Sequence, residues 1–307
     1  KYNILFLCTK ILSKKMSHKS GFVNIIGNPN VGKSTFLNAI LGQKLAITTP
    51  KAQTTRHRIL GILNGDDYQM VFSDTPGIIK PAYKMHEAMM SFVKEALKDA
   101  DVIIYIVDVN ETQIKDESVL KFLQNTKLPV FLLINKIDTV NQEKVEAAAQ
   151  HWKSLLPNAR IFPISALHAF NIKELIDQIK QELPEGPPYY PKDTLTDKSE
   201  RFFVEEMIRE KILLFYKKEI PYSVEVKVEE FKDEPEIVKI RATIFVIRPS
   251  QKGIIIGHQG ERIKRVGTEA RKDIEAFLGK KVFLDLHVKV KKDWRDNDNL
   301  LKQFGYK

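Results

Sequence analysis

Residues 27–34, with the sequence GNPNVGKS, constrain the fold of this chain more than any other feature. They fit the pattern G-x-x-x-x-G-K-S and lie between a predicted buried strand at 22–26 and a predicted helix at 33–41. The glycines allow backbone N–H groups to wrap an anion at the positive end of that helix. An ordinary glycine turn is the alternative, and it does not account for the strand–loop–helix context. The stretch therefore predicts a phosphate-binding loop in a nucleotide-binding α/β domain.

Two side chains of this loop carry specific expectations. We expect the Lys33 ammonium group to reach the β- and γ-phosphates of a nucleotide, and the Ser34 hydroxyl to ligate magnesium. The expected nucleotide contacts of the segment are Gly27, Asn28, Asn30, Val31, Gly32, Lys33, Ser34 and Thr35.

Short apolar strands alternate with longer helical patterns as far as residue 182. The predicted strands are 22–26, 68–72, 102–107, 130–134 and 161–164, and the predicted helices are 33–41, 85–98, 117–124, 142–155 and 172–182. Strands separated by helices of this length indicate a mostly parallel sheet with helices on both faces. We therefore assign residues 21–183 to an α/β domain with the P-loop NTPase fold.

A proline-rich stretch and a change of pattern mark a second domain. Residues 184–198 hold four prolines without periodicity, which predicts a stiff extended linker. From 199 to 307 the predicted order is α-β-β-α-α-β, a smaller α+β domain.

Residues 1–20 precede both domains. We expect Met16 to be the functional start and residues 1–15 an upstream read-in, with a short amphipathic surface anchor as the alternative.

Basic residues are concentrated in the second domain. The chain has a net charge of +10, and residues 239–292 alone hold 14 basic and 5 acidic residues. Such a segment attracts polyanions because binding releases the counterions condensed on nucleic acid, although a solvated basic face has the same composition.

The single cysteine, Cys8, excludes an intramolecular disulfide framework and a cysteine-based metal cluster, and it fits a cytoplasmic location. No stretch reaches the roughly 18 apolar residues of a membrane-spanning helix.

The tetrapeptide NKID at 135–138 follows a predicted strand and predicts which base is bound. A carboxylate there accepts both the ring N–H and the exocyclic amine of guanine, and adenine lacks that pair of donors. Leaving a buried carboxylate unpaired costs about 1–3 kcal/mol or more, so we expect strong discrimination against ATP. The expected guanine contacts are Asn135, Lys136 and Asp138, with Ser165, Ala166 and Leu167 lining the pocket after the last strand.

The sequence DTPG at 74–77 follows the strand predicted at 68–72. We expect Asp74 to hold magnesium through water and the Gly77 N–H to meet the γ-phosphate, with a simple turn as the alternative. Ile78 and Ile79 follow, where many GTPases place a glutamine that orients the attacking water. We therefore expect slow intrinsic hydrolysis of GTP to GDP and phosphate, stimulated by a partner or by a monovalent cation.

The sequence IIIGHQG at 254–260 lies between two predicted helices in the basic segment. Two glycines separated by two residues let a nucleic-acid backbone approach closely, and the following helix offers N–H donors to phosphate. KH domains clamp about four nucleotides with such a loop, whereas a packing corner between helices is the alternative. The loop, the charge and the α-β-β-α-α-β order together indicate a type II KH domain that binds single-stranded RNA. The expected RNA contacts are Ile256, Gly257, His258, Gln259, Gly260, Arg262, Lys264 and Arg265, with residues 254–256 and Ile263 as an apolar groove wall.

The nucleotide motifs, in this order, place residues 22–182 in the P-loop GTPase superfamily, and further stretches resemble the Era family of bacterial ribosome-assembly GTPases. These include KAQTTRHR at 51–58, PPYYP at 187–191 and TEARKD at 268–273, and the resemblance extends from about residue 21 to residue 306. It implies that Thr55, in preference to Thr54, completes the magnesium shell. We expect catalysis to rest on Lys33, Thr55 and Gly77.

The resemblance also implies partners and a role. The implied partners are GTP and GDP, the 3′ end of small-subunit ribosomal RNA, the small ribosomal subunit, and a peripheral contact with the cytoplasmic face of the cell membrane. Magnesium is the implied cofactor, and Asn30 matches a position that some relatives use to hold potassium, which makes potassium dependence a hypothesis. We expect a monomer.

Three functional interpretations remain open at this point. In the first, GTP orders residues 53–57 and 78–84 and so changes how the KH domain meets RNA. In the second, the chain is an RNA-binding assembly factor for which GTP is a structural ligand and hydrolysis is incidental. In the third, it is a membrane-associated GTPase that acts through residues 1–15.

Overall fold

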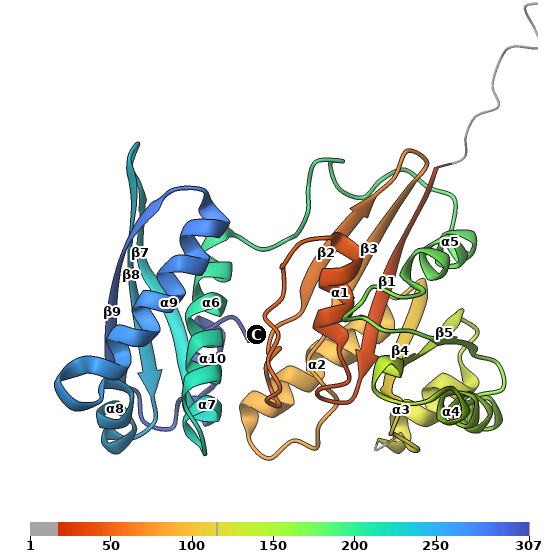
Figure 1. Ribbon diagram of the computed structural model, residues 1–307, viewed down its shortest axis with the longest axis horizontal. Helices are drawn as coiled ribbons and strands as arrows, with labels where there is room; N and C mark the ends of the chain where they lie inside the picture. The colour runs from red at the N-terminus through yellow and green to blue at the C-terminus, as the bar shows by residue number, and fades with distance from the viewer. Residues whose placement is uncertain (1–17, 115, 307) are drawn as a thin grey trace, which may run out of the picture.

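Two β-sheets organise the described part of the chain, residues 18–114 and 116–306 of a computed structural model (Figure 1). The first sheet has the strand order β2-β3-β1-β4-β5-β6, and the second has the order β7-β8-β9. The expectations for residues 1–15, a functional start downstream of them and a surface anchor within them, concern residues outside this described part.

The first sheet is the mostly parallel sheet that the alternating pattern predicts. Every pair of neighbouring strands is parallel except β2 and β3. The strand β4 lies inside the sheet and is buried on both faces, which explains its continuous apolar run. The strands are β1 (Lys19–Gly27), β2 (Ile59–Asn64), β3 (Tyr68–Asp74), β4 (Val102–Asp108), β5 (Val130–Asn135) and β6 (Arg160–Pro163).

Sequence analysis missed the edge strand β2. It pairs antiparallel with β3, with Ile59 opposite Asp74 and Asn64 opposite Gln69. The signal was present, because an apolar run followed by Asn-Gly-Asp-Asp at 64–67 and a second apolar run is typical of a hairpin.

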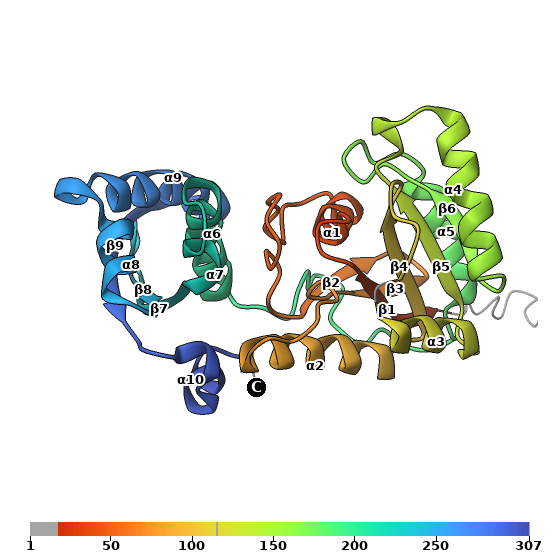
Figure 2. The ribbon, with the colours of Figure 1, turned by 90° about the horizontal axis from the view of Figure 1, so that it is seen from below.

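Five helices cover the two faces of this sheet: α1 (Lys33–Leu41), α2 (Lys84–Lys98), α3 (Glu117–Asn125), α4 (Gln142–Leu155) and α5 (Ile172–Glu182). On one face α1 and α5 pack with Ile104, and on the other α2, α3 and α4 pack with Tyr105. Figure 2 shows α1 and α2 on opposite sides of the sheet. Because successive residues of a strand point to opposite faces, β4 contributes to both cores.

The second sheet combines an antiparallel pair, β7 (Glu225–Asp233) and β8 (Ile237–Val246), with β9 (Lys281–Val290), which runs parallel to β8. The helices α8 (Pro249–Ile256) and α9 (Glu261–Leu278) form the crossover between the two parallel strands, and α6 (Glu200–Phe215) precedes the sheet. This confirms the α-β-β-α-α-β order. The remaining short elements are α7 (Ile220–Ser223), α10 (Asp298–Gln303), and the 3₁₀ turns η1 (Ile137–Thr139), η2 (His258–Gly260) and η3 (Trp294–Asp296).

The proline-rich stretch at 184–198 is hydrogen-bonded to the edge of the first sheet. The Ile62 N–H donates to the Leu195 carbonyl at 2.8 Å, and the Gln69 amide donates to the Tyr190 carbonyl at 2.8 Å. The stretch thereby covers the exposed edge of β2. It delivers the chain to α6, which faces the loop between α1 and β2 (Figures 1 and 2).

Candidate nucleotide site and RNA-binding groove

The predicted phosphate-binding loop joins β1 to α1, and two of its positions require glycine. Gly27 has a φ of +154° and Gly32 a φ of +99°. A Cβ atom on Gly27 would lie 2.3 Å from the Ile106 carbonyl oxygen, and one on Gly32 would lie 2.3 Å from Asn135 Nδ2. Any side chain at either position would therefore collide with the loop's neighbours.

Lys33 is buried at the base of the loop. Its Nζ donates to the carbonyl oxygens of Gly27 at 3.1 Å and of Asn28 at 2.8 Å. Burial lowers the pKa of Lys33 to about 8, and the negative charges of Asp74 and Glu111 oppose this effect. A bound phosphate would add negative charge beside the ammonium group and stabilise its protonated form.

Three oxygen-bearing side chains from separate segments converge beside this lysine. Ser34 Oγ lies 2.7 Å from Thr55 Oγ1 and donates to Asp74 Oδ2 at 2.6 Å. Burial raises the pKa of Asp74 to about 6, opposed by its hydrogen bond from Ser34 and the charge of Lys33. Its Oδ1 is buried and accepts no hydrogen bond from the described residues. Two hydroxyls and a carboxylate with spare acceptor capacity are hard oxygen ligands, so these residues fit magnesium.

The side chains of the adjacent residues Thr54 and Thr55 form hydrogen bonds with different partners. Thr54 Oγ1 lies 2.6 Å from Thr49 Oγ1 and donates to the Lys51 carbonyl at 2.6 Å. Thr55 is the one whose hydroxyl joins the cluster with Ser34. The geometry therefore favours Thr55 over Thr54 as the ligand from this loop.

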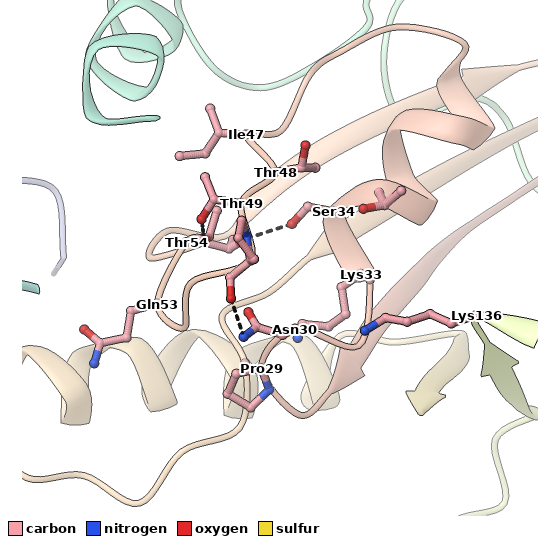
Figure 3. A pocket seen from close by; sticks show the side chains of 15 residues that line it. Pro29, Asn30, Lys33, Ser34, Ile47, Thr48, Thr49, Gln53, Thr54 and Lys136 are labelled. Carbon is pink, nitrogen blue, oxygen red and sulfur yellow. Dashed lines mark hydrogen bonds between the residues drawn. The ribbon is translucent and has the colours of Figure 1, made fainter. Parts of the chain in front are cut away.

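A cavity of about 450 Å³ opens over the cluster. Figure 3 shows side chains from the phosphate loop and from residues 47–55 around it, with Lys136 reaching in from the loop after β5. Asn30 Nδ2 donates to the Pro50 carbonyl at 3.0 Å and so connects the two lining segments. Gly77 also lines the cavity. The cavity thus joins segments that are more than 100 positions apart in the sequence.

The predicted guanine-binding residues lie together at the carboxyl ends of β5 and β6. Asn135 Nδ2 donates to the Val31 carbonyl at 2.7 Å, and its Oδ1 accepts from the Ala166 N–H at 2.9 Å. Asp138 Oδ1 accepts from Ser165 Oγ at 2.6 Å. In this structure Asn135 therefore connects the phosphate loop to the loop after β6, and Ser165 positions Asp138.

Two acidic residues, one at the end of β4 and one in the loop after it, were not among the site residues predicted from the sequence. Asp108 pairs with Lys136 at 2.8 Å, and Glu111 accepts from Asn28 Nδ2 at 3.2 Å. The available signal was their position, because polar residues that directly follow a buried parallel strand lie at the same edge as the phosphate loop. Leu167, predicted to line the base pocket, is 72% exposed.

In the loop after β3, the adjacent residues Gly77 and Ile78 lie in different surroundings. A Cβ atom on Gly77 would lie 2.8 Å from Pro29 of the phosphate loop, so the two loops touch. The Ile78 N–H donates to the Gly27 carbonyl at 3.1 Å, whereas the Ile78 side chain is buried in the core beneath α2. The Ile78 side chain is thus directed into the core rather than into the cavity.

The predicted G-x-x-G loop connects α8 to α9. Gly257 and Gly260 have φ values of +73° and +79°. A Cβ atom on Gly260 would meet nothing within 4 Å among the described residues, so this position is open to a ligand backbone. His258 and Gln259 are not buried, and Ile256 packs partly against the core.

Several of the basic residues that follow this loop contact other residues as well as solvent. The Arg265 guanidinium lies 4.4 Å from the centroid of the Phe215 ring, a cation–π contact with α6. Arg262 lies directly against Gly257, since a Cβ atom there would be 2.6 Å from Arg262 Cγ. Lys264 lines the groove described next.

A cavity of about 480 Å³ lies between α9 and β9. Its apolar wall differs from the expected one, because Ile255 is fully buried in the core and only Ile263 of the predicted wall lines the cavity. The parallel pairing of β9 with β8 places new residues here, among them Phe283, which is 59% exposed. The residues lining this groove are Ile263, Lys264, Gly267, Thr268, Arg271, Phe283, Leu284 and Leu286.

Over 18–114 and 116–306, none of the helices has the length and apolar character needed to cross a membrane. Within the same ranges no group of three or more His, Cys, Asp and Glu side chains is arranged to hold a metal ion. The Ser34–Thr55–Asp74 cluster is of a different kind, since two of its three side chains are hydroxyls.

Comparison with known families and structures places these observations in context. The family model described as 50S ribosome-binding GTPase matches residues 22–136, and the KH domain model matches residues 219–295. Two solved Era structures are each 40% identical to this chain, with the match covering 94% of this chain and 99% of the solved one. One is an Aquifex aeolicus Era variant bound to GDP and AlF4⁻, with a TM-score of 0.90. The other is Era in complex with MgGDPNP and nucleotides 1506–1542 of 16S ribosomal RNA, with a TM-score of 0.91.

Proposed function

The chain belongs to the Era family of GTPases, and from this premise we propose that it hydrolyses GTP with magnesium and binds the 3′-terminal region of small-subunit ribosomal RNA. The observation that carries the proposal is the convergence of Ser34, Thr55 and Asp74 beside the buried Lys33, in a chain that also has a KH groove. The proposed role is assistance in assembling the small ribosomal subunit, in the cytoplasm.

The proposed reaction is the hydrolysis of the γ-phosphate. The oxygen of a water molecule bonds to the γ-phosphorus while the bond from that phosphorus to the β–γ bridging oxygen breaks. The electron pair of the broken bond leaves with GDP, and the two protons of the water are shared between the released phosphate and solvent. Bound magnesium would neutralise charge on the β- and γ-phosphate oxygens.

The chain's own residues have distinct parts in this proposal. Lys33 holds the β- and γ-phosphate oxygens by charge, and the Gly77 N–H donates to the γ-phosphate. Ser34 and Thr55 would hold the ion through their hydroxyls and Asp74 through water. This assignment accounts for the spare, buried Oδ1 of Asp74.

Selection of guanine rests on Asp138 in this proposal. Its hydrogen bond from Ser165 orients the carboxylate, which can then accept from both donors on the guanine edge. Asn135 acts indirectly, since both ends of its amide are held by the two loops that enclose the base. Adenine would leave the carboxylate without those donors, at a cost of about 1–3 kcal/mol or more.

For RNA, we propose that the backbone follows the Gly257–Gly260 loop and that unstacked bases enter the groove between α9 and β9. The groove combines the apolar surfaces of Ile263 and Phe283 with the charges of Lys264 and Arg271. Apolar and aromatic walls suit stacked or splayed bases, and the basic residues neutralise phosphate. The similarity of the chain to the solved Era complex with a 16S ribosomal RNA segment supports RNA binding as such.

The test is the affinity of the full chain for a short RNA that copies the ribosomal 3′ end, measured with a GTP analogue and with GDP. Gly260→Asp, which adds a charge and a side chain at a positive φ in the loop, should weaken binding at least tenfold. Gly279→Asp is the matched control, because Gly279 also has a positive φ (+66°) and open space around it but lies at the opposite end of α9. Equal losses in both variants would refute the assignment of the loop.

A second candidate function is favoured by one observation, the burial of Ile78 in the core beneath α2. With no side chain there to orient water, GTP would serve as a structural ligand and hydrolysis would be incidental. The RNA measurement separates the two, because a switch requires different RNA affinities in the two nucleotide states. Equal affinities would favour the structural-ligand interpretation.

A peripheral membrane contact, implied by the family resemblance, would rest on residues 1–15, which lie outside the described part of the chain. Sedimentation of the full chain with anionic liposomes, compared with a chain lacking residues 1–15, tests it. Binding that survives the deletion would assign the contact to another part of the molecule.

A further inference from the structure

The backbone just before Thr55 is held by a side chain from the other domain. Arg209, on α6, donates from Nη2 to the Thr54 carbonyl at 2.5 Å and from Nη1 to the Gln53 carbonyl at 3.5 Å. Arg209 is 1% exposed, and Glu206 accepts two hydrogen bonds from it, at 2.7 and 2.5 Å. This buried ion pair fixes the guanidinium, so the two carbonyl groups are held at a defined place on α6.

The residue just after Thr55 is held from the same domain. Arg56 is fully buried and donates to the carbonyl oxygens of Val224 at 2.6 Å and Pro221 at 3.0 Å. It also pairs with Glu225 at 3.1 Å. Thr55 therefore lies between two arginine anchors that both join it to residues 206–225.

Contacts earlier in the same loop extend this attachment. Glu210 accepts from the Thr48 N–H at 3.3 Å, and Lys51 Nζ donates to the carbonyl oxygens of Leu213 and Tyr216 at the end of α6. A loop of this length between α1 and β2 would otherwise lose much conformational entropy on being ordered. The hydrogen bonds to the second domain restrict that freedom in the folded protein.

We propose that Arg209, oriented by Glu206, is a positioning residue for GTP hydrolysis: it holds the backbone of the loop so that the Thr55 hydroxyl faces Ser34 and Asp74. This inference rests on the proposed function, in which Thr55 is a magnesium ligand. It means that α6 of the KH domain completes the hydrolytic site of the GTPase domain. A partner that moves α6 away from residues 53–55 would then slow hydrolysis without touching the nucleotide.

The experiment compares three full-length variants with the wild type. Glu206→Gln with Arg209→Met removes both charges together, so that no buried charge is left without a partner. Arg209→Lys keeps the charge but lacks the planar fork. Asp298→Asn is the matched control, because it removes the Lys84–Asp298 ion pair, which also crosses between the domains and is formed by residues outside 48–57.

Four quantities are measured for each variant: kcat, KM for GTP, the magnesium dependence of binding of a fluorescent non-hydrolysable GTP analogue, and GDP affinity. In the double variant we expect kcat to fall about 10- to 100-fold and the half-saturating magnesium concentration for analogue binding to rise similarly, as for loss of a group that orients a ligand. KM and GDP affinity should stay close to wild type, because the phosphate loop and the guanine pocket are intact. Arg209→Lys should give an intermediate kcat, and Asp298→Asn should match the wild type.

Thr55→Ala separates the failure of this inference from the failure of the proposed function. If Thr55→Ala leaves kcat and the magnesium dependence unchanged, the assignment of Thr55 itself falls. If Thr55→Ala lowers kcat but both Arg209 variants behave like Asp298→Asn, only the positioning role is overturned. Support requires, in addition, that the Arg209 changes have no further effect in a Thr55→Ala background, because residues that act through one group are not additive.

A purely structural role makes a different prediction. It would lower the thermal stability of the double variant and weaken GDP binding and analogue binding together, and this pattern would overturn the proposal. Arg209→Lys keeps the experiment decisive if the double variant does not fold, since it retains the buried ion pair with Glu206.

Discussion

The imidazole ring of His57 stacks on the phenol ring of Tyr306, with centroids 4.5 Å apart and planes inclined by 34°. The Tyr306 hydroxyl donates to Glu225 at 2.7 Å, and Glu225 also pairs with Arg56. Burial lowers the pKa of His57 well below its usual value, and the nearby positive charge of Arg209 adds to this effect. Burial likewise raises the pKa of Tyr306 well above its usual value. The two rings are therefore uncharged where the end of the described chain meets the loop between α1 and β2.

Two substitutions of Tyr306 should each destabilise the protein, and the larger truncation should have the larger effect. Tyr306→Phe removes one of the two hydrogen bonds that Glu225 Oε2 accepts, the other coming from Arg56. Loss of a hydrogen bond to a charged group should lower the free energy of unfolding by about 1.5–3 kcal/mol. Tyr306→Ala also removes the buried ring and should lower it by about 3–5 kcal/mol. Urea unfolding measures both. Tyr189→Phe is the control, because Tyr189 is 52% exposed, and a Tyr306→Phe protein no less stable than this control would contradict the prediction.

Asp138→Asn should weaken GTP binding. The amide offers only one acceptor where the carboxylate offers two, so a guanine donor loses a charge-assisted hydrogen bond worth about 1.5–3 kcal/mol, or roughly 10- to 150-fold in affinity. Titration with a fluorescent GTP analogue measures the loss. Asp66→Asn, an equivalent change at an exposed residue of the same domain, should leave affinity unchanged; a similar loss there would point to a nonspecific effect.

Potassium in place of sodium should increase the rate of GTP hydrolysis. Asn30, with a φ of +64°, bridges the phosphate loop to the Pro50 carbonyl over the cavity, where amide and carbonyl oxygens suit a monovalent cation. A tenfold increase corresponds to about 1.4 kcal/mol of transition-state stabilisation. Asn30→Ala should abolish the difference between the two ions, whereas Asn30→Asp keeps an oxygen and tolerates the same backbone conformation. An identical rate in both salts would show the potassium hypothesis to be wrong.

Stability should fall as the pH drops from about 6.5 to about 4, in part because of His86. Burial, followed by the positive charge of Arg295, lowers the pKa of His86 to about 4. Its Nδ1 accepts from the Ala82 N–H at 3.3 Å, which requires the neutral ring. The unfolded chain binds a proton in this window that the folded chain does not, so the free energy of unfolding decreases by about 1–3 kcal/mol.

Chemical unfolding of the His86→Gln protein at several pH values isolates this contribution. The variant should lose that part of the pH dependence, whereas His151→Gln, on the exposed surface of α4, should retain it. Parallel curves for the wild type and His86→Gln would contradict the prediction.

Local patterns in the sequence were sufficient for the two folds and for most of the candidate site. The phosphate loop, the NKID tetrapeptide and the G-x-x-G loop each depend on a few neighbouring residues between a strand and a helix. The alternating apolar pattern predicted five of the six strands of the first sheet and the element order of the KH domain, and the structure confirms both. The missed strand β2 lies at the sheet edge and its apolar run is interrupted by Gly61, although the Asn-Gly turn that follows it is typical of a hairpin.

Only the tertiary structure shows which of two adjacent threonines lies beside Ser34, which strand borders the groove beside α9, and what holds the loop between α1 and β2 in place. Each depends on contacts between residues far apart in the sequence, such as Arg209 and Thr54, which are separated by 155 positions. Phe283 illustrates the same limit, since alternation along β9 does not reveal that this exposed side chain lies in a groove beside α9. The sequence determined the chemistry of the loops because that chemistry is local, and only folding could determine their neighbours, because packing brings together segments that share no local pattern.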